Sequence, residues 1–392
     1  MGRTGTQLIE LPMRVALLYV LTFAMAALPA NSARAVDRPP FYKVFQFPAD
    51  KIPRIDGDPS DWDMVPDDYA IGMDQMTDDS HPNVRPDPKK LDLRVKVGWV
   101  KGLNRLYFLY EAYKDYWDFS QPGLHNDIFE LVVNGNHSAG PFIARWRPDL
   151  SVPEFDAYFT MQGVPAQNYH IFTPALEKDW CMAWGPQQWL KELPYANHAC
   201  QYNFKPGEGG KLVLEFYITP FDLASPDGPE KSVETPLTEN KTIGLSWAVM
   251  DYRGPNTTKE QAFWNLASDP TKFAPPSTLG GVSTKLAGHN MFGDASLLMP
   301  FKLMPLEAKF VKPFEAKWSF KVLDMSKRLV AFKDESVGQV TSWKWDFGDG
   351  TTSSEQNPQH TYKDPNNYVV VLDIEGPAGK SRFSRVWDVT VK

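Results

Sequence analysis

The stretch that decides the fold class covers residues 91–99 and reads LDLRVKVGW. Apolar residues occupy every odd position, whereas Asp, Arg and Lys occupy positions 92, 94 and 96. This period of two is typical of a β-strand with one buried face and one wet face. We therefore expect strands, rather than amphipathic helices, to build the core.

Four further segments have the same character, and most are bounded by Gly, Pro, Asn or Asp: 105–113, 127–133, 212–218 and 242–250. Only Gln187–Leu193 and Lys259–Leu266 have the pattern of short helices. The sequence therefore predicts an all-β protein, with one large β-sandwich over residues 40–303 and an irregular insertion at 147–205.

Composition limits the possible classes. The 392 residues include 13 Trp, 15 Tyr, 24 Phe and 34 Pro, which argues for packed cores and many strand and turn boundaries, and against a disordered chain. The net charge is −7 and there is no block of Lys or Arg, so we expect no nucleic-acid partner.

Residues 1–35 resemble a secretory signal peptide. Arg3 and Arg14 precede an apolar run from Val15 to Leu28, and small residues then lead to a cleavage site near Ala35. The alternative is an uncleaved anchor, but about fourteen apolar residues are short for a bilayer. No later stretch reaches that length. We expect a secreted, periplasmic or cell-envelope protein with no integral membrane segment after signal removal.

The chain has two cysteines, Cys181 and Cys200. In an oxidising compartment they form a plausible disulfide, and the alternative is two buried thiols. Either interpretation removes a cysteine-based zinc site. Three tryptophans, Trp180, Trp184 and Trp189, lie close by; we interpret them as a hydrophobic cluster under a loop, with an exposed aromatic platform as the alternative.

A domain boundary is predicted where Pro300, Pro305 and Pro313 interrupt any periodicity. We place a linker at 304–314. Residues 315–392 then contain five short strand patterns, as expected for an immunoglobulin-like sandwich: 318–323, 329–332, 342–345, 368–374 and 382–391.

Within this second unit, residues 343–350 read WKWDFGDG and residues 358–362 read PQHTY. These motifs, followed by a strand at Tyr368, closely resemble the PKD (polycystic kidney disease) domain, a β-sandwich of extracellular proteins. The resemblance implies a structural motif made of Trp345, Asp346, Gly348, Asp349, Gly350 and Tyr362. Asn366-Asn367 departs from the family, which usually has Gly before this Tyr.

The large unit carries motifs of its own. Residues 54–62 read RIDGDPSDW, 105–115 read RLYFLYEAYKD, and 126–136 read NDIFELVVNGN; 246–253 and Phe263-Trp264 follow. Taken in order, they resemble carbohydrate-binding module family 9. The resemblance implies a sugar edge held by a carboxylate between two aromatic walls, and the matching carboxylate is Glu130.

The other members of this implied site are less direct matches. Leu124-His125 occupies the first wall position, so the nearest aromatic candidate is Trp117; Trp264 and Phe273 are candidates for the second wall. Arg145 is a guanidinium candidate. The alternatives are core positions for Trp264 and Trp117, and a surface or paired carboxylate for Glu130.

Calcium is a candidate cofactor, and nothing in the sequence requires one. The family commonly holds structural calcium, and Asp127 is a possible calcium or turn ligand. Acidic loops at Asp56–Asp61, Asp74–Asp79 and Asp115–Asp118 also contain oxygen ligands, although none matches an EF-hand.

Catalysis has little support, because the sequence has no HExxH, GxSxG or P-loop motif. Two carboxylates suffice for a glycoside hydrolase, and related folds bind haem, so catalysis and haem binding stay as alternatives.

The preferred hypothesis is an exported non-catalytic protein that binds a polysaccharide or oligosaccharide, with the PKD-like unit as a spacer or contact module. The alternatives are an extracellular scaffold or adhesion protein that binds other envelope or extracellular proteins, and an accessory subunit of a glycoside-degrading system with hydrolase activity.

Overall fold

The computed structural model describes residues 38–79, 81, 83–117, 119, 127–137, 163–175, 179–253, 260–267, 278–279, 282–283 and 295–392. The regular elements in these ranges are β-strands and short 3-10 helices, which confirms the all-β prediction. The predicted signal segment 1–35 lies outside the described residues.

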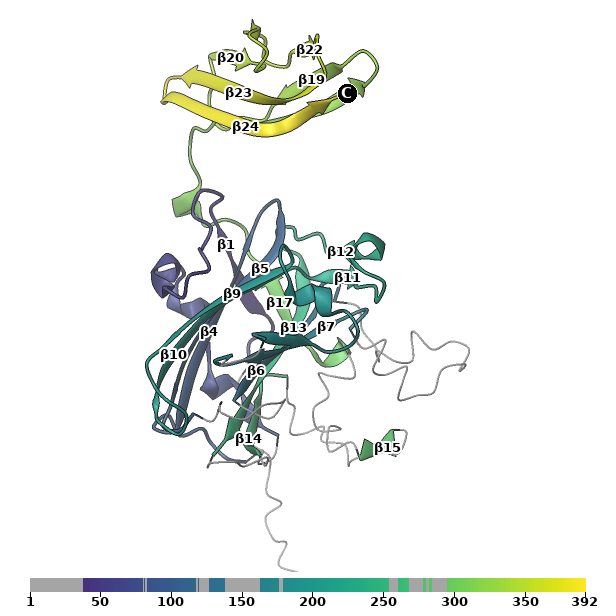
Figure 1. Cartoon of the computed structure of the whole chain (residues 1–392). Coiled ribbons are helices and arrows are strands. Elements are labelled where there is room, and N and C mark those ends of the chain that lie inside the picture. The colour runs from purple at the N-terminus through teal and green to yellow at the C-terminus, as the bar shows by residue number, and fades with distance from the viewer. Residues whose placement is uncertain are drawn as a thin grey trace, which may run out of the picture.

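The large unit is a sandwich of two sheets that share strand β1. Its first half, Tyr42–Val44, pairs with β17, and its second half, Phe45–Phe47, pairs with β4. Sheet A has the order β8-β7-β6-β13-β17-β1, and sheet B has the order β1-β4-β5-β10-β9 (Figure 1). The strands of these two sheets are β1 (Tyr42–Phe47), β4 (Leu91–Val100), β5 (Leu103–Lys114), β6 (Ile128–Asn134), β7 (Gln167–Phe172), β8 (Cys181–Ala183), β9 (Ala196–Tyr202), β10 (Gly210–Ile218), β13 (Thr242–Tyr252) and β17 (Met299–Leu303).

Shorter strands complete the unit. β14 (Glu260–Asn265) pairs with β13 and with β3 (Thr77–Asp78), and β2 (Ile71–Gly72) pairs with β4. Two small hairpins are β11 (Phe221–Leu223) with β12 (Val233–Glu234), and β15 (Thr278–Leu279) with β16 (Val282–Ser283). The 3-10 helices of this unit are η1 (Pro59–Trp62), η2 (Asp67–Tyr69), η3 (Met73–Gln75), η4 (Gln188–Lys191), η5 (Pro229–Lys231) and η8 (Ala295–Leu297).

Alternation along the strands separates an inner face from an outer face. On β4 the odd residues from Leu91 to Trp99 join the main core between the sheets, as their period of two predicts. Outward residues of β5 and β10, such as Tyr107 and Tyr217, pack against Trp62 in a second cluster. Sheet B is therefore covered on part of its outer face as well.

Two local predictions are wrong. The segment Lys259–Leu266, expected to be helical, contains strand β14. A short apolar run is compatible with the period of a helix or of a strand, and pairing with β13 selects the strand here. The 147–205 insertion, expected to be irregular, contributes β7, β8 and β9. The helix expected at Gln187–Leu193 shortens to the 3-10 helix η4.

Strands β8 and β9 stand at opposite ends of the strand order, yet they approach each other. Trp180, which immediately precedes β8, stacks on His198 of β9 with ring centroids 4.6 Å apart. This contact brings the two far ends of the sandwich together along one side.

The second unit has its own core. Sheets β18-β19-β22 and β21-β20-β23-β24 enclose Trp318, Trp345, Tyr362 and their neighbours. The strands are β18 (Trp318–Asp324), β19 (Leu329–Asp334), β20 (Ser342–Asp346), β21 (Thr352–Ser353), β22 (Gln359–Thr361), β23 (Asn366–Gly376) and β24 (Gly379–Val391). A segment containing η9 (Ala308–Phe310) joins the two units (Figure 1).

Candidate functional site

The outer face of sheet A carries a buried polar row that crosses three strands. Glu130 of β6 lies opposite His170 of β7 and opposite Ala248 of β13. Its neighbours Phe129 and Leu131 face the inner core, so Glu130 faces outward. Ala248 belongs to a small buried hydrophobic cluster that also contains Val132 and Phe263.

The Glu130 carboxylate has two partners on β7. Its Oε1 accepts a hydrogen bond from Asn168 Nδ2 at 3.2 Å and lies 2.6 Å from His170 Nε2. The three residues are 2%, 3% and 7% exposed. Carboxylate, amide and imidazole groups therefore meet at one point where water has little access.

Besides the ring nitrogens of His170, two oxygen atoms of this face lack hydrogen-bond partners among the described residues. Asn168 Oδ1 and Ser246 Oγ are buried, and no donor or acceptor in the described part of the chain reaches either. Ser246 lies opposite Val132, which in turn lies opposite Asn168. Buried polar groups are nearly always satisfied, so these two atoms mark a place where a polar partner is expected.

An aromatic ring lies beside the row. The indole of Trp184 stacks on His170, with centroids 5.3 Å apart and planes at 22°. The Trp184 amide also donates to Asn168 O at 2.8 Å, which holds this residue along the edge of β7. Trp184 is only partly buried. It is the described tryptophan that borders the Glu130 group.

The structure does not bring the predicted walls to Glu130. Trp117 is 1% exposed, stacks on Phe204 at 4.9 Å and donates from Nε1 to Gly210 O at 3.0 Å. It belongs to the inner core, as does Trp264, which is 5% exposed. Neither offers a ring face to a ligand in this conformation. Arg145 and Phe273 lie outside the described residues.

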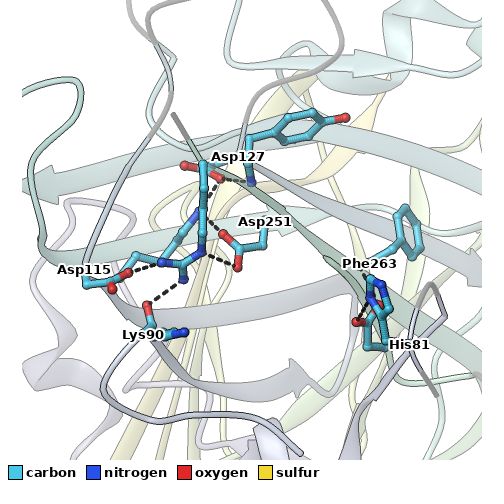
Figure 2. Close-up of polar contacts among 10 residues, drawn as sticks. His81, Lys90, Asp115, Asp127, Asp251 and Phe263 are labelled. Atoms are coloured by element: carbon cyan, nitrogen blue, oxygen red, sulfur yellow. Dashed lines mark hydrogen bonds and ion pairs between the residues drawn. The ribbon is translucent and has the colours of Figure 1, made fainter. Parts of the chain in front are cut away.

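A second charged group closes one rim of the sandwich. Lys114, Asp127 and Asp251 lie at the adjoining ends of β5, β6 and β13 and are at most 5% exposed. Arg253 extends the group by joining Asp251 to Asp115 (Figure 2). Among the described residues, no cluster of three or more His, Cys, Asp or Glu side chains has the geometry of a metal site.

The predicted disulfide needs correction: Cys181 and Cys200 are free thiols. Cys181 lies on β8 and Cys200 on β9, and both belong to or pack against the main core. Burial raises the pKa of Cys181 well above its usual range and raises the pKa of Cys200 to about 12. Both side chains therefore behave as apolar core groups rather than as thiolates.

The motif at 54–62 has a structural anchor that the sequence did not reveal. Glu215 of β10 accepts hydrogen bonds from Gly57 N at 2.7 Å and from Trp62 Nε1 at 2.9 Å. The motif therefore folds onto sheet B through one buried carboxylate. This arrangement gives the segment a role in the fold, at a distance from the Glu130 row on sheet A.

The motif of the second unit also makes structural contacts. Asp346 Oδ1 accepts from Gly348 N at 2.9 Å, and Asp349 Oδ2 lies 2.7 Å from His360 Nε2. Tyr362 donates to Phe347 O at 3.2 Å and stacks on Tyr368. Trp345, at 0% exposure, fills the core. The Gly350 backbone has a φ of +87°, in the left-handed region.

Within the ranges that the structure covers, no helix has the length and apolar character to cross a bilayer.

Comparison with known families and proteins identifies the second unit. The PKD domain family model matches residues 326–391, which confirms the resemblance drawn from the motifs. Collagenase ColQ1 of Bacillus cereus (strain Q1) is 47% identical over 60 residues, which are 15% of this chain and 6% of that enzyme. The chain thus spans only a small part of the curated relative that it matches.

Two solved structures resemble different parts of the chain. A carbohydrate-binding module family 9 from Caldicellulosiruptor kristjanssonii in complex with cellotriose is 12% identical, with a TM-score of 0.39, and covers 69% of this chain and 98% of its own. The PKD1 domain of the metalloprotease PrtV from Vibrio cholerae is 26% identical, with a TM-score of 0.18, and covers 19% of this chain and 93% of its own.

Proposed function

We propose that this protein is a non-catalytic carbohydrate-binding protein that holds a polysaccharide or its chain end on the outer face of sheet A. The contact group consists of Glu130, Asn168, His170, Ser246 and Trp184. In the proposal, the PKD domain acts as a spacer or contact module.

The observation that carries this proposal is the pair of unsatisfied polar atoms beside a buried carboxylate. Asn168 Oδ1 and Ser246 Oγ have no partner among the described residues, and Glu130 Oε1 is close to both Asn168 Nδ2 and His170 Nε2. A sugar edge offers hydroxyl groups that donate and accept at short spacing, which matches this mixture of acceptors and donors. The Trp184 ring next to His170 supplies an apolar plane of the kind that stacks on sugar C–H groups.

Binding at this place has a structural requirement. Glu130 and His170 are 2% and 7% exposed and contact each other, so a sugar hydroxyl has to enter between them or replace one contact. Hydrogen bonds to a carboxylate in such a site are worth about 1.5–3 kcal/mol each. Loss of the Glu130 carboxylate is therefore expected to reduce affinity by at least tenfold.

The test is a glycan array combined with pull-down on insoluble polysaccharides. The wild type should show saturable binding, and Glu130→Gln and Trp184→Ala should weaken it while the melting temperature stays close to that of the wild type. Glu111→Gln is the matched control, because Glu111 lies on the opposite sheet, across from Arg94 and Val213. Binding that survives Glu130→Gln unchanged would place the sugar elsewhere.

One observation favours a second candidate function. Trp117 and Trp264, which the sequence offered as sugar walls, are both core residues. This placement supports an extracellular scaffold or adhesion protein in which the family-like sandwich no longer binds sugar. Absence of any hit across the array and the insoluble polysaccharides would favour this alternative.

The proposed place of action is outside the cytoplasm. The basic, apolar and small-residue order of residues 1–35 supports export, and it is a property of the sequence alone. Mass measurement of the N-terminus of the natural protein tests this point. A mature start near Val36 is expected, whereas an intact N-terminus on a membrane fraction would indicate an anchor.

A further inference from the structure

Lys114 spans the gap between the two sheets of the large unit. It follows the inward-facing residues Tyr110 and Ala112 on β5, in sheet B, and its side chain is 0% exposed. Its Nζ lies 2.9 Å from Asp251 Oδ1 and contacts Asp127 Oδ1, both in sheet A or at its edge. An ammonium group thus sits between two buried carboxylates.

The surroundings hold these carboxylates in place. Asp127 Oδ1 also accepts a hydrogen bond from Tyr252 N at 3.1 Å, and Asp251 Oδ2 lies 3.0 Å from Arg253 Nε. Arg253 continues to Asp115 Oδ1 at 2.5 Å (Figure 2). The group as a whole contains three carboxylates and two cationic side chains. Burial raises the pKa of Tyr110, and the negative charges of Asp127 and Asp251 add to this effect.

A calcium ion does not fit this arrangement. Calcium takes six to eight oxygen ligands at about 2.3–2.6 Å, and it would need the carboxylate oxygens that the ammonium already contacts. A divalent ion beside a buried ammonium would also meet strong repulsion in a medium with little water to screen it. Asp127, considered from the sequence as a possible calcium ligand, is instead a partner of Lys114.

We propose that this position is a cation site that a side chain of the protein itself occupies. The Lys114 ammonium takes the place that a metal ion would take, and it ties the ends of β5, β6 and β13 together without metal. Two consequences follow. First, chelators should not change the stability of the fold at this rim. Second, removal of the lysine side chain should create a cavity that contains two carboxylates and accepts a divalent ion.

Thermal unfolding of the full chain tests both consequences. The wild type should melt at the same temperature in EDTA and in millimolar calcium chloride. Lys114→Ala should melt lower in EDTA and should recover by roughly 5 °C or more in calcium. Lys114→Met is the matched control, because it fills the space without charge and should not respond to calcium. A Lys114→Ala protein that ignores calcium, or fails to fold even with calcium present, would overturn the proposal.

Terbium luminescence adds a local measurement. The Trp117 ring centroid lies 5.4 Å from Lys114 Nζ, close enough to sensitise a terbium ion at the ammonium position. Lys114→Ala should therefore show terbium emission on excitation at the tryptophan band, and Lys114→Ala/Asp127→Asn should lose most of it. Equal emission from the wild type, abolished by Asp127→Asn, would show that the native site binds metal and would contradict the proposal. Neither assay involves sugar, so its result is independent of the proposed function.

Discussion

Glu215 accepts a hydrogen bond from the indole Nε1 of Trp62 at 2.9 Å, although 153 positions separate the two residues in the sequence. The same carboxylate accepts from the amides of Gly57 and Asp56. One side chain of β10 thus fixes the whole turn at 54–62, and Trp62 packs into the cluster on the outer face of sheet B.

Replacement of Glu215 by leucine should destabilise the large unit by about 2–4 kcal/mol, because a buried donor left without a partner costs about 1–3 kcal/mol. Urea unfolding monitored by tryptophan fluorescence measures this change. Glu215→Gln keeps an acceptor oxygen and is the matched control, so it should cost less. Equal losses for the two variants would show that shape, rather than hydrogen bonding, holds the turn.

The stability of the large unit should also depend on the ionisation of Glu215. Burial raises the pKa of this carboxyl group, and the hydrogen bonds from Trp62, Gly57 and Asp56 only partly oppose that effect. A group with a raised folded-state pKa stabilises the protein while protonated. Its contribution is therefore present below the unfolded value of about 4.3 and is lost as pH rises through the folded value.

The measurement is the difference in the free energy of unfolding between wild type and Glu215→Gln from about pH 4 to pH 7. The wild type should lose stability relative to the variant as the pH rises through the lower part of this range. A constant difference across the range would show that Glu215 ionises with an ordinary pKa.

Some of this architecture is readable from the sequence and some is not. The strand expected at 91–99 is β4, Leu91–Val100. Strict alternation of apolar and polar residues places all the apolar side chains on one face only in a strand. The motif also predicts Glu130 as a site residue, and the proposed site is built on it. Its partners Asn168 and His170 were missed, because they belong to another strand and only the pairing of β6 with β7 brings them together. A signal existed, since polar and apolar residues alternate over 168–171.

Lys114 was missed for a different reason. A lysine near the end of a strand is normally interpreted as a solvated residue, and nothing local identifies the carboxylates that bury it. Its position offered one clue, because Lys114 falls on the same side of the alternating strand pattern as Tyr110 and Ala112, whose side chains face the inner core. The role of Asp127 could not be settled from the sequence either, because a turn, a metal ion and an ion pair all use the same carboxylate.

Both cysteines should resist thiol reagents in the native protein. Burial raises the pKa of Cys200 to about 12 and raises that of Cys181 well above its ordinary value, so little thiolate is present near pH 8. Iodoacetamide labelling followed by mass spectrometry should show almost no native modification and two labels after unfolding in denaturant. An unfolded, unreduced chain that takes no label would indicate a disulfide and would contradict the free thiols of the structure.

The PKD domain should lose stability in acid through Asp349. Burial works against ionisation of this carboxyl group, but hydrogen bonds from Thr351 and His360 outweigh it and lower the pKa below the usual value. The contribution is present above the unfolded value of about 3.9 and is lost as pH falls through the folded value. Urea unfolding of the full chain from about pH 5 to pH 2.5, followed by CD with hydrogen exchange over 342–376, should show this loss, and Asp349→Asn should reduce it.

Two glycines in the same motif should differ in their tolerance of alanine. Gly348 has a φ of +78° and Gly350 has a φ of +87°, so alanine is strained at both positions. A Cβ at Gly348 would also lie 2.3 Å from Val369 O, whereas a Cβ at Gly350 meets nothing within 4 Å. Gly350→Ala should therefore cost about 1 kcal/mol, the backbone term alone.

Gly348→Ala should cost clearly more, about 3 kcal/mol or above, because β23 has to move away from the turn in addition. Urea unfolding of the two variants side by side measures the difference, with hydrogen exchange over 366–376 to localise it. Similar costs at the two positions would mean that the backbone of β23 yields easily at Val369, and that the close approach of the turn to this strand does not stabilise the domain.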